Sequence, residues 1–483
     1  MQGSRRVEAV RQVLAPRRAA TAVLVAFALL TAAGCGARWT HAQQTVVDRR
    51  DAIAGTAKAA AGATSGVVGS GPTASNAGSG STGSTGAGPS GSGGAIGPTA
   101  GDTASGASGP LPCTAPSNAP GVTADSITVG EISSLTGPAP GINAPAAAAS
   151  RAYVAYLNSN GGVCGRKVVL KEADDGSDNG IYRSVVQDMA PNILGLAGGT
   201  GTGDAGGADI VENQKLPFVA EAVSPAMAHV STVFNMSPDL PDFHTEVGAY
   251  KFLFDQGIRK AALIYPSADQ PRTFMEDKYR PQIEAAGIAI ALDDPIPLTT
   301  LNYDSVARAI ANSGADFVIM LHTADASAQL AQAIAASGYK GVKYQDYPTA
   351  YASHYPDLVG GAGGGTISAT RALPNEEAGS NAELDRFLQW MGQVAPDQPL
   401  DVFASDSWAG AKAFFDGLQA LPGPISREAL VTQLRSMTSY DAGGFIGQMA
   451  LGPTSTVGHG CQILMTLVNG AWTRLTPATG FLC

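Results

Sequence analysis

Residues 127–137, ITVGEISSLTG, begin the stretch that decides the fold; an Ala-rich run to Asn158 and the segment 168–178, VVLKEADDGSD, follow. The first run is β-rich and bounded by polar and turn residues, which is typical of a buried strand. Alanine favours a helix that packs closely on a sheet, and Gly161-Gly162 ends this helix because glycine accepts the left-handed cap conformation. Strand, helix and strand in this order predict a βαβ unit and therefore a parallel sheet.

The same stretch resembles the amino-terminal signature of a known family. LTG at 135–137, GGVCGRK at 161–167 and DDGSD at 174–178 are similar to the motifs of solute-binding proteins of branched-chain amino-acid ABC importers. The resemblance extends from about residue 122 to the C-terminus and implies an α/β, two-lobed type I periplasmic-binding fold. Each lobe would be a mainly parallel sheet flanked by helices, with a ligand held in the cleft between the lobes.

The predicted lobes exchange chain segments. Lobe 1 is expected at about 122–255 and 366–438, and lobe 2 at about 256–365 and 439–483. In this interpretation Gly363–Thr370 is the crossing back to the first lobe. Asn469-Gly470 lies between two apolar runs and predicts a closing β-hairpin.

Residues 1–34 have the pattern of an export signal. Basic residues precede an apolar run at 19–33, which is shorter than the ~20 residues that span a bilayer. The small residues before Cys35 resemble a bacterial lipobox, which implies acylation of Cys35 and anchoring at the outer face of the cell membrane. The usual leucine three positions before the cysteine is replaced by Ala32, so an ordinary cleaved signal peptide is the alternative.

Residues 35–121 predict a tether between this anchor and the binding domain at 122–483. A short helix is expected at 41–62, and the Gly/Ser-rich sequence after it cannot bury a core, which predicts disorder.

The formal net charge is −10 without a basic patch, which argues against nucleic acid as a partner. We expect a monomer.

The five cysteines fit export, since an oxidising compartment preserves disulfides. With Cys35 acylated, the other four allow three pairings, and we favour Cys113–Cys164 and Cys461–Cys483. Cys113 and Cys164 precede the first two strands, and adjacent parallel strands begin at the same sheet edge; the second pair would fasten the C-terminal tail. A metal site is the alternative, but close Cys or His spacing is missing. No metal or cofactor is expected.

Loops at the C-terminal ends of the strands are the candidate ligand contacts, because open α/β sheets bind ligands there. As the resemblance implies, hydroxyls and backbone N–H groups of lobe 1 would hold a carboxylate, while polar residues of lobe 2, including an acidic one for an ammonium group, would set selectivity. Asp406 aligns with the aspartate of the family's Tyr-Asp-Ala motif, although a helix cap is its alternative role. The predicted ligand residues are Ser134, Thr136, Thr200, Thr202, Ser224, Tyr265, Asp269, Asp325, Tyr347 and Asp406, with Asp346 as a further candidate.

The loop after the third strand allows three interpretations. Gly201, Gly203 and Gly206 match G-x-G-x-x-G, with Glu221 placed like the acidic residue of a dinucleotide site. Against a nucleotide, the loop follows the third strand instead of the first. The second interpretation, which the resemblance implies, is a loop that binds the ligand's carboxylate through Thr200 and Thr202, and the third is a plain loop.

The body of the chain favours no class of enzyme. It lacks G-x-S-x-G, a Gly-Lys-Ser/Thr phosphate loop and H-E-x-x-H, and none of the six histidines stand at ligand spacing. The sequence therefore predicts an extracytoplasmic, lipid-anchored receptor that delivers a small polar solute, such as an amino acid, to an ABC permease. A sensor of the same fold without a transporter and a nucleotide-binding enzyme are the alternatives.

Overall fold

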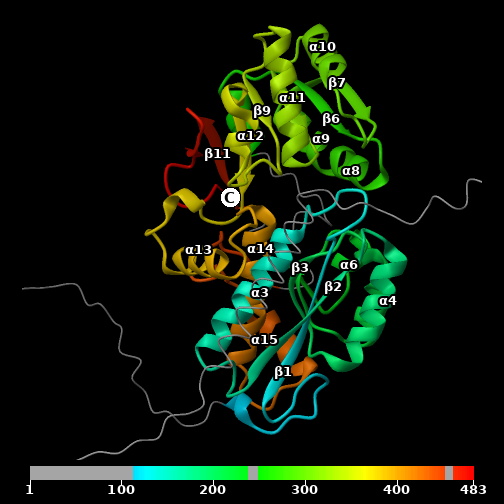
Figure 1. The fold of residues 1–483 in the computed structure, drawn as a ribbon, viewed down its shortest axis with the longest axis vertical. Coiled ribbons are helices and arrows are strands. Elements are labelled where there is room, and N and C mark those ends of the chain that lie inside the picture. The colour runs from blue at the N-terminus through cyan, green and yellow to red at the C-terminus, as the bar shows by residue number, and fades with distance from the viewer. Residues whose placement is uncertain (1–111, 238–247, 452–460, 483) are drawn as a thin grey trace, which may run out of the picture. The chain divides into compact units, whose positions relative to one another are not determined.

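The computed structural model describes residues 112–237, 248–451 and 461–482, which form two α/β lobes, each built on one sheet (Figure 1). The predicted signal segment 1–34, Cys35, the helix at 41–62 and most of the tether lie outside these residues. Among the described helices, none combines the length and apolar character needed to span a membrane.

The first sheet contains the predicted βαβ unit, which is confirmed. Its order is β2-β1-β3-β4-β5 with parallel pairing throughout, and Ile127 of β1 stands opposite Val168 of β2. The strands are β1 (Ser126–Ser133), β2 (Lys167–Asp174), β3 (Leu196–Thr200), β4 (Phe218–Glu221) and β5 (Val233–Asn235). The helices of this lobe are α3 (Ala144–Ser159), α4 (Asn179–Met189), α5 (Ala208–Asn213), α6 (Pro225–Ala228), α13 (Ala382–Val394), α14 (Val402–Gln419) and α15 (Arg427–Ser436).

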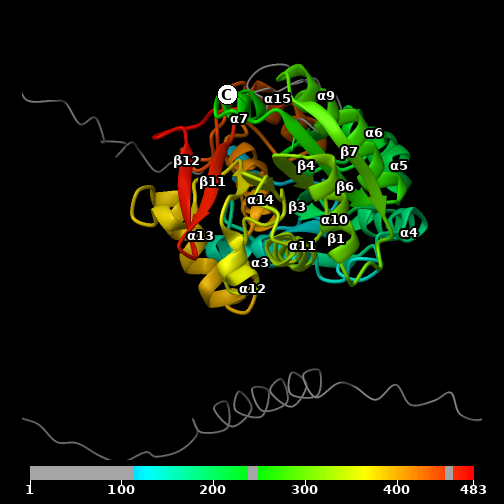
Figure 2. The same ribbon diagram turned by 90° about the horizontal axis from the view of Figure 1, so that it is seen from above.

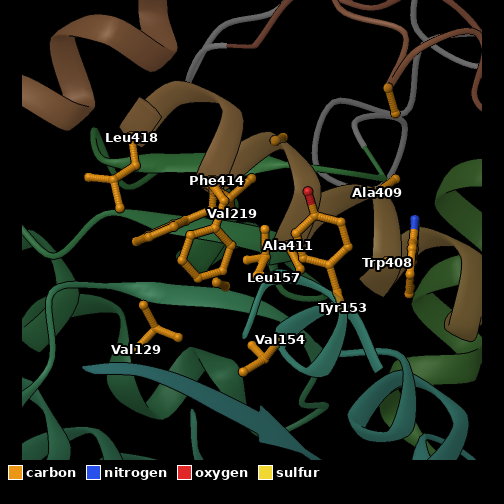
Figure 3. Packing of buried hydrophobic residues seen from close by; sticks show 14 of the residues in the cluster. Val129, Tyr153, Val154, Leu157, Val219, Trp408, Ala409, Ala411, Phe414 and Leu418 are labelled. Carbon is orange, nitrogen blue, oxygen red and sulfur yellow. The ribbon is translucent and has the colours of Figure 1, made fainter. Parts of the chain in front are cut away.

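Helices α3 and α14 lie side by side on one face of this sheet (Figure 1). Alanines dominate the buried side of α3, so its backbone approaches the sheet closely. Tyr153 of α3 meets Trp408 of α14 edge to face, with ring centroids 4.9 Å apart, and Phe414 packs beside Val219 in the same core (Figure 3). The opposite face is covered by a second apolar cluster that includes residues of α4, α5 and α6.

The second sheet has the order β12-β11-β10-β9-β8-β6-β7. Its pairings are parallel except that β11 runs antiparallel to both of its neighbours, β10 and β12. Its strands are β6 (Lys260–Pro266), β7 (Ala289–Ile296), β8 (Phe317–Met320), β9 (Tyr344–Asp346), β10 (Thr366–Thr370), β11 (Ile463–Val468) and β12 (Ala471–Thr476). Its helices are α7 (Gly248–Asp255), α8 (Asp269–Thr273), the π-helical turn η4 (Phe274–Tyr279), α9 (Arg280–Ala285), α10 (Asp304–Ser313), α11 (Ala324–Ser337) and α12 (Tyr355–Val359). Short 3₁₀ turns are η1 (Pro112–Thr114), η2 (Ala190–Asn192), η3 (Asp204–Gly207), η5 (Gly360–Gly363) and η6 (Asn375–Glu377).

The predicted boundaries between the lobes need correction. β10 pairs with β9 and β11 inside the second sheet, so the chain crosses to the first lobe after Thr370 and not within Gly363–Thr370. Tyr250 and Leu253 of α7 pack in a core of the second sheet, whereas Tyr440 and Phe445 pack in the core of the first. Each segment is therefore assigned to the lobe whose core buries its apolar side chains.

The predicted C-terminal hairpin is confirmed, and β11 and β12 lie side by side (Figure 2). Asn469 and Gly470 both have positive φ, 52° and 79°. A tight two-residue turn of this kind requires positive φ at both positions, which Asn and Gly adopt at little cost.

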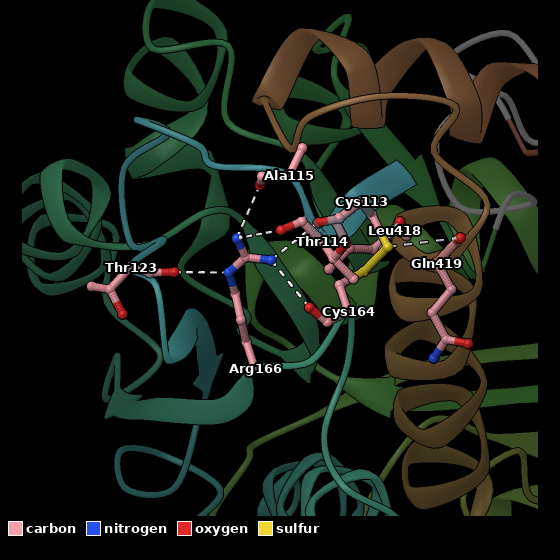
Figure 4. The surroundings of a disulfide bond; sticks show 8 residues. All are labelled: Cys113, Thr114, Ala115, Thr123, Cys164, Arg166, Leu418 and Gln419. Atoms are coloured by element: carbon pink, nitrogen blue, oxygen red, sulfur yellow. Dashed lines mark hydrogen bonds between the residues drawn. A yellow bond between two sulfur atoms is a disulfide. The ribbon is translucent and has the colours of Figure 1, made fainter. Parts of the chain in front are cut away.

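A disulfide joins Cys113 and Cys164, with 5.6 Å between their Cα atoms, and this is the pairing expected from the sequence (Figure 4). The guanidinium of the buried Arg166 donates to the carbonyls of Cys113 at 3.0 Å, Cys164 at 3.1 Å and Thr123 at 2.8 Å. The N-terminal segment is thereby held against the start of β2. Cys461 is also disulfide-bonded, and its expected partner Cys483 lies outside the described residues.

Candidate functional site

A cavity of about 660 Å³ is lined by residues of both lobes, at the C-terminal ends of their parallel strands. The first lobe contributes the loop after β1, the beginning of α4 and the ends of β3 and β4. The second lobe contributes the helical segment 271–282 and loops after β6, β8 and β9. A concave site of this size with a few polar groups among apolar walls is typical of small-molecule binding sites.

The first-lobe threonines predicted to contact a ligand are placed in two different ways. Thr200 and Thr202 line the cavity. Thr200 Oγ1 donates to Glu221 Oε2 at 3.1 Å, and the backbone N–H of Thr202 donates to Ser134 Oγ at 2.9 Å. Thr136 does not line the cavity, and its hydroxyl donates to Asp174 at 2.5 Å.

Ser134 and Ser224 serve the first lobe's own structure. Ser134 is buried and its hydroxyl donates to Asp175 Oδ1 at 2.6 Å. Ser224 caps α6, since its hydroxyl accepts a hydrogen bond from the N–H of Met227 at 3.2 Å. Neither residue lines the cavity.

Of the residues predicted in the second lobe, Tyr265, Asp325 and Tyr347 do not line the cavity. Tyr265 and Tyr347 are buried in the cores of this lobe, and the Tyr347 hydroxyl donates to Gln345 Oε1 at 2.6 Å. Asp325 is exposed in the first turn of α11, and Asp269 is the first residue of α8. Asp346 does line the cavity, where its Oδ2 accepts a hydrogen bond from the Tyr250 hydroxyl at 3.3 Å.

Asp406 does not line the cavity, and the residue that caps α14 is Asp401. Asp406 Oδ2 accepts hydrogen bonds from both Nε, at 3.1 Å, and Nη2 of Arg371. Arg371 lines the cavity, and its Nη2 lies 4.0 Å from Glu221 Oε1. Arg371 directly follows β10, in the segment that crosses to the first lobe, whereas Glu221 and Asp406 belong to the first lobe, so this group of charges fixes the crossing segment to the first lobe.

Burial governs the protonation of the carboxylates in the cavity wall. It raises the pKa of Glu221, although the neighbouring Arg371 opposes this shift. It raises the pKa of Asp346 to about 7, against the hydrogen bond from Tyr250. Burial acts in this direction on both side chains, because an ionised carboxylate loses its hydration there.

Most of the residues that line the cavity from the second lobe were not predicted from the sequence. The missed set is dominated by one helical segment, in which the spacing of the lining residues follows a helix face; its members are Pro271, Phe274, Lys278, Tyr279 and Gln282. That spacing is readable in the sequence. The sequence does not reveal that this face borders a cleft instead of packing on a sheet.

The glycines of the loop after β3 are explained by close packing against α4. A Cβ at Gly206 would stand 1.8 Å from the carbonyl oxygen of Asn179, and one at Gly203 would stand 2.5 Å from that of Asp178. The plain-loop interpretation therefore accounts for the G-x-G-x-x-G pattern without a nucleotide. Within residues 112–237, 248–451 and 461–482, no group of three or more His, Cys, Asp or Glu is placed to hold a metal ion.

Comparison with known proteins places this geometry in a family. The sequence profile of the periplasmic binding protein family matches residues 126–471. No curated protein matches the chain. Among solved structures, the fatty acid ABC transporter substrate-binding protein from Thermomonospora curvata is 20% identical with a TM-score of 0.61, covering 75% of this chain and 94% of that one.

Two further structures share the fold. The solute-binding protein of an ABC transporter from R. palustris, in complex with benzoate, is 17% identical with a TM-score of 0.60, covering 74% of this chain and 96% of that one. A leucine binding protein from Thermotoga maritima is 13% identical with a TM-score of 0.59, covering 72% of this chain and 98% of that one. With its two sheets, its cavity between them and the match over both lobes, the chain belongs to the periplasmic binding protein family.

Proposed function

We propose that this protein is the extracytoplasmic receptor of an ABC importer, which captures a small organic solute in the cavity and delivers it to a permease. The observation that carries the proposal is the cavity of about 660 Å³ with walls from both lobes. A solute that contacts both walls stabilises the closed arrangement relative to an open one. A permease can then distinguish the solute-bound receptor by its closed conformation. The structural neighbours named above as substrate- or solute-binding proteins of ABC transporters support the same role.

The proposal extends to the position of the protein in the cell. Export by residues 1–34, acylation of Cys35 and a tether up to about residue 121 would hold the receptor at the outer face of the membrane as a monomer. Thr200 and Thr202, which line the first-lobe wall, would contact the solute. Both side chains have a hydroxyl that accepts as well as donates hydrogen bonds.

Thermal unfolding of the full-length protein in the presence of candidate solutes tests this function. The panel contains amino acids, fatty and aromatic acids, amides, sugars and nucleotides. A solute at 100 times its dissociation constant stabilises the folded state by about 2.7 kcal/mol, which raises the melting temperature measurably. Stabilisation by one class of small metabolite is the expected result, and stabilisation by nucleotides alone would contradict the proposal.

A further inference from the structure

The carboxyl group of Asp346 lies where the second sheet meets the cavity. Asp346 is the last residue of β9, is 8% exposed and lines the cavity. It is paired with Ile319 of β8 and Ile367 of β10, and side chains at paired positions point to the same face of a sheet. Both isoleucines are buried in an apolar cluster that also contains Tyr250 of α7. The carboxyl group therefore has an apolar neighbour on each side.

This carboxyl group has a hydrogen-bond donor beside it but no counter-ion. The Tyr250 hydroxyl donates to Asp346 Oδ2 at 3.3 Å, and Tyr250 also lines the cavity. Within residues 112–237, 248–451 and 461–482, no lysine, arginine or histidine forms an ion pair with Asp346. Asp346 thus differs from Glu221, the other buried carboxylate of the cavity wall, whose ionised form is favoured by Arg371.

The remaining titratable groups of this wall do not compensate a charge on Asp346. They come from α7, η4, β9 and the segments after β8 and β10, and they are Tyr250, Lys278, Tyr279, His322, Tyr347 and Arg371. The tyrosines are uncharged near pH 7 because a phenol ordinarily has a pKa of about 10. Burial lowers the pKa of His322, which is therefore neutral there too. The charges of Lys278 and Arg371 favour ionised Glu221, and neither contributes to the pKa of Asp346.

We infer that Asp346 meets the solute as a neutral carboxylic acid and donates a hydrogen bond to an acceptor atom of the solute. This inference rests on the proposed function and adds that binding is coupled to a proton. A protonated carboxyl group has an O–H to donate, whereas an ionised one only accepts.

The coupling sets the direction in which affinity changes with pH. Burial raises the pKa of Asp346 to about 7, so the free protein loses this proton as the pH rises past neutrality. A solute that needs the O–H then binds only after the protein has taken the proton up again, and its affinity falls with rising pH. A cationic group beside Asp346 would have the opposite effect, because it favours the ionised carboxylate.

Calorimetric titration of the full-length protein at pH 6 and pH 8.5 tests the coupling. The probes are leucine, octanoate, benzoate, benzamide and glucose. We expect the strongest binder to bind about 10- to 50-fold more weakly at pH 8.5 than at pH 6. At pH 8.5 its binding should take up about one proton, which is measured by repeating the titration in phosphate and in Tris, two buffers with different heats of ionisation. Affinity that rises with pH, with release of a proton, would overturn the inference.

Substitution of the acid identifies the group that titrates. Asp346→Asn keeps an N–H donor at every pH, so it should bind the same solute with equal affinity at pH 6 and pH 8.5. The matched control is Asp325→Asn, which changes an exposed acid of α11 outside the cavity and should keep the pH dependence. If folded Asp346→Asn keeps it as well, another group such as His322 titrates and the inference is overturned.

A second variant tests the same group without changing the acid. Tyr250→Phe removes the hydrogen bond that opposes the raised pKa of Asp346. The pKa should rise further, so the fall in affinity is expected at a higher pH than in the unsubstituted protein. An unchanged or lower midpoint of the pH profile would overturn the inference.

The two titrations also separate this inference from the proposed function. A solute that binds with the same affinity at pH 6 and pH 8.5 would leave the receptor function intact and overturn the role of Asp346. If none of the probes binds at either pH, both are overturned.

Discussion

The ion pair between Arg371 and Asp406 fixes the segment in which the chain crosses from β10 to the first lobe. Asp406 is 3% exposed in its side chain and Arg371 25%, so the pair is held largely away from water. Removing Asp406 leaves Arg371 with a more distant carboxylate, Glu221 at 4.0 Å, and loss of one partner of a buried pair destabilises more than the pair itself contributes.

We therefore expect Asp406→Asn to lower the free energy of unfolding by about 1–3 kcal/mol. The control is Lys251→Met, which breaks a surface pair with Asp255 in which both side chains are more than half exposed (56% and 57%). The control should change stability by less than about 1 kcal/mol. Urea unfolding measures both variants; equal effects would show that the Arg371 pair is as weak as a surface pair.

Single residues also mark the limit of prediction from sequence. Asp406 could be selected from its motif, but its partner Arg371 stands 35 positions earlier, directly after β10, and nothing in the local sequence connects the two residues. Tyr265 and Tyr347 were correctly placed near strand ends, yet their side chains face the core. Tyr265 and Tyr347 belong to two different apolar clusters of the second sheet, so a side chain at a strand end packs in a core unless it projects beyond the strand.

At the scale of elements, the close contact of α3 and α14 with β3 depends on Gly198. This residue has a φ of +77°, and a Cβ there would stand 2.3 Å from Ser150 Oγ of α3 and 2.8 Å from Ser407 Oγ of α14. Any side chain therefore brings both backbone strain and a steric clash with the two helices.

Gly198→Ala is expected to lower the free energy of unfolding by about 2–4 kcal/mol. Gly392→Ala is the matched control, because Gly392 lies in the exposed part of α13 with nothing within 4 Å of a Cβ. An alanine in a helix should stabilise by up to about 1 kcal/mol. A tolerated Gly198→Ala, measured by the same urea unfolding, would mean that α3 and α14 can move away from the sheet.

Elements specified by local patterns could be predicted, and those specified by distant partners could not. Helix α13 (Ala382–Val394) and the β11–β12 hairpin carry their caps, periodicity or turn residues in their own sequence. β10 is a short run whose assignment depends on pairing with β9 and β11, the latter almost a hundred residues away. The residue composition of the π-helical turn η4 does not distinguish it from an α-helix, although this turn provides Lys278.

For the molecule as a whole, buried carboxylates make stability depend on pH. Burial raises the pKa of Glu131 to about 8 and those of Asp204, Asp346 and Asp401 to about 7, from ordinary values of 4.5 for Glu and 3.8 for Asp. Between the unfolded and folded pKa values the folded state binds protons that the unfolded state has released. Stability must then rise as the pH falls through this window.

We expect the free energy of unfolding to increase as the pH is lowered from about 8 to about 5, by about 1.4 kcal/mol per pH unit for each group that holds its proton. Glu131→Gln, which imitates the protonated acid, should flatten the slope above pH 7, where the other three groups have largely titrated. Urea unfolding at a series of pH values measures this. A stability that is constant or rises with pH in this range would show that the carboxylates are ionised when buried.

The central claim is that a small solute occupies the cavity between the lobes, and a matched pair of tryptophan substitutions tests it most directly. Ala268 lines the cavity, so the larger side chain of Ala268→Trp would take up space that the solute needs. Ala335→Trp adds the same side chain on the exposed face of α11. Calorimetry with the solute that stabilises the unsubstituted protein should show binding lost in Ala268→Trp and retained in Ala335→Trp. Undiminished binding by a folded Ala268→Trp protein would place the solute elsewhere and contradict the account.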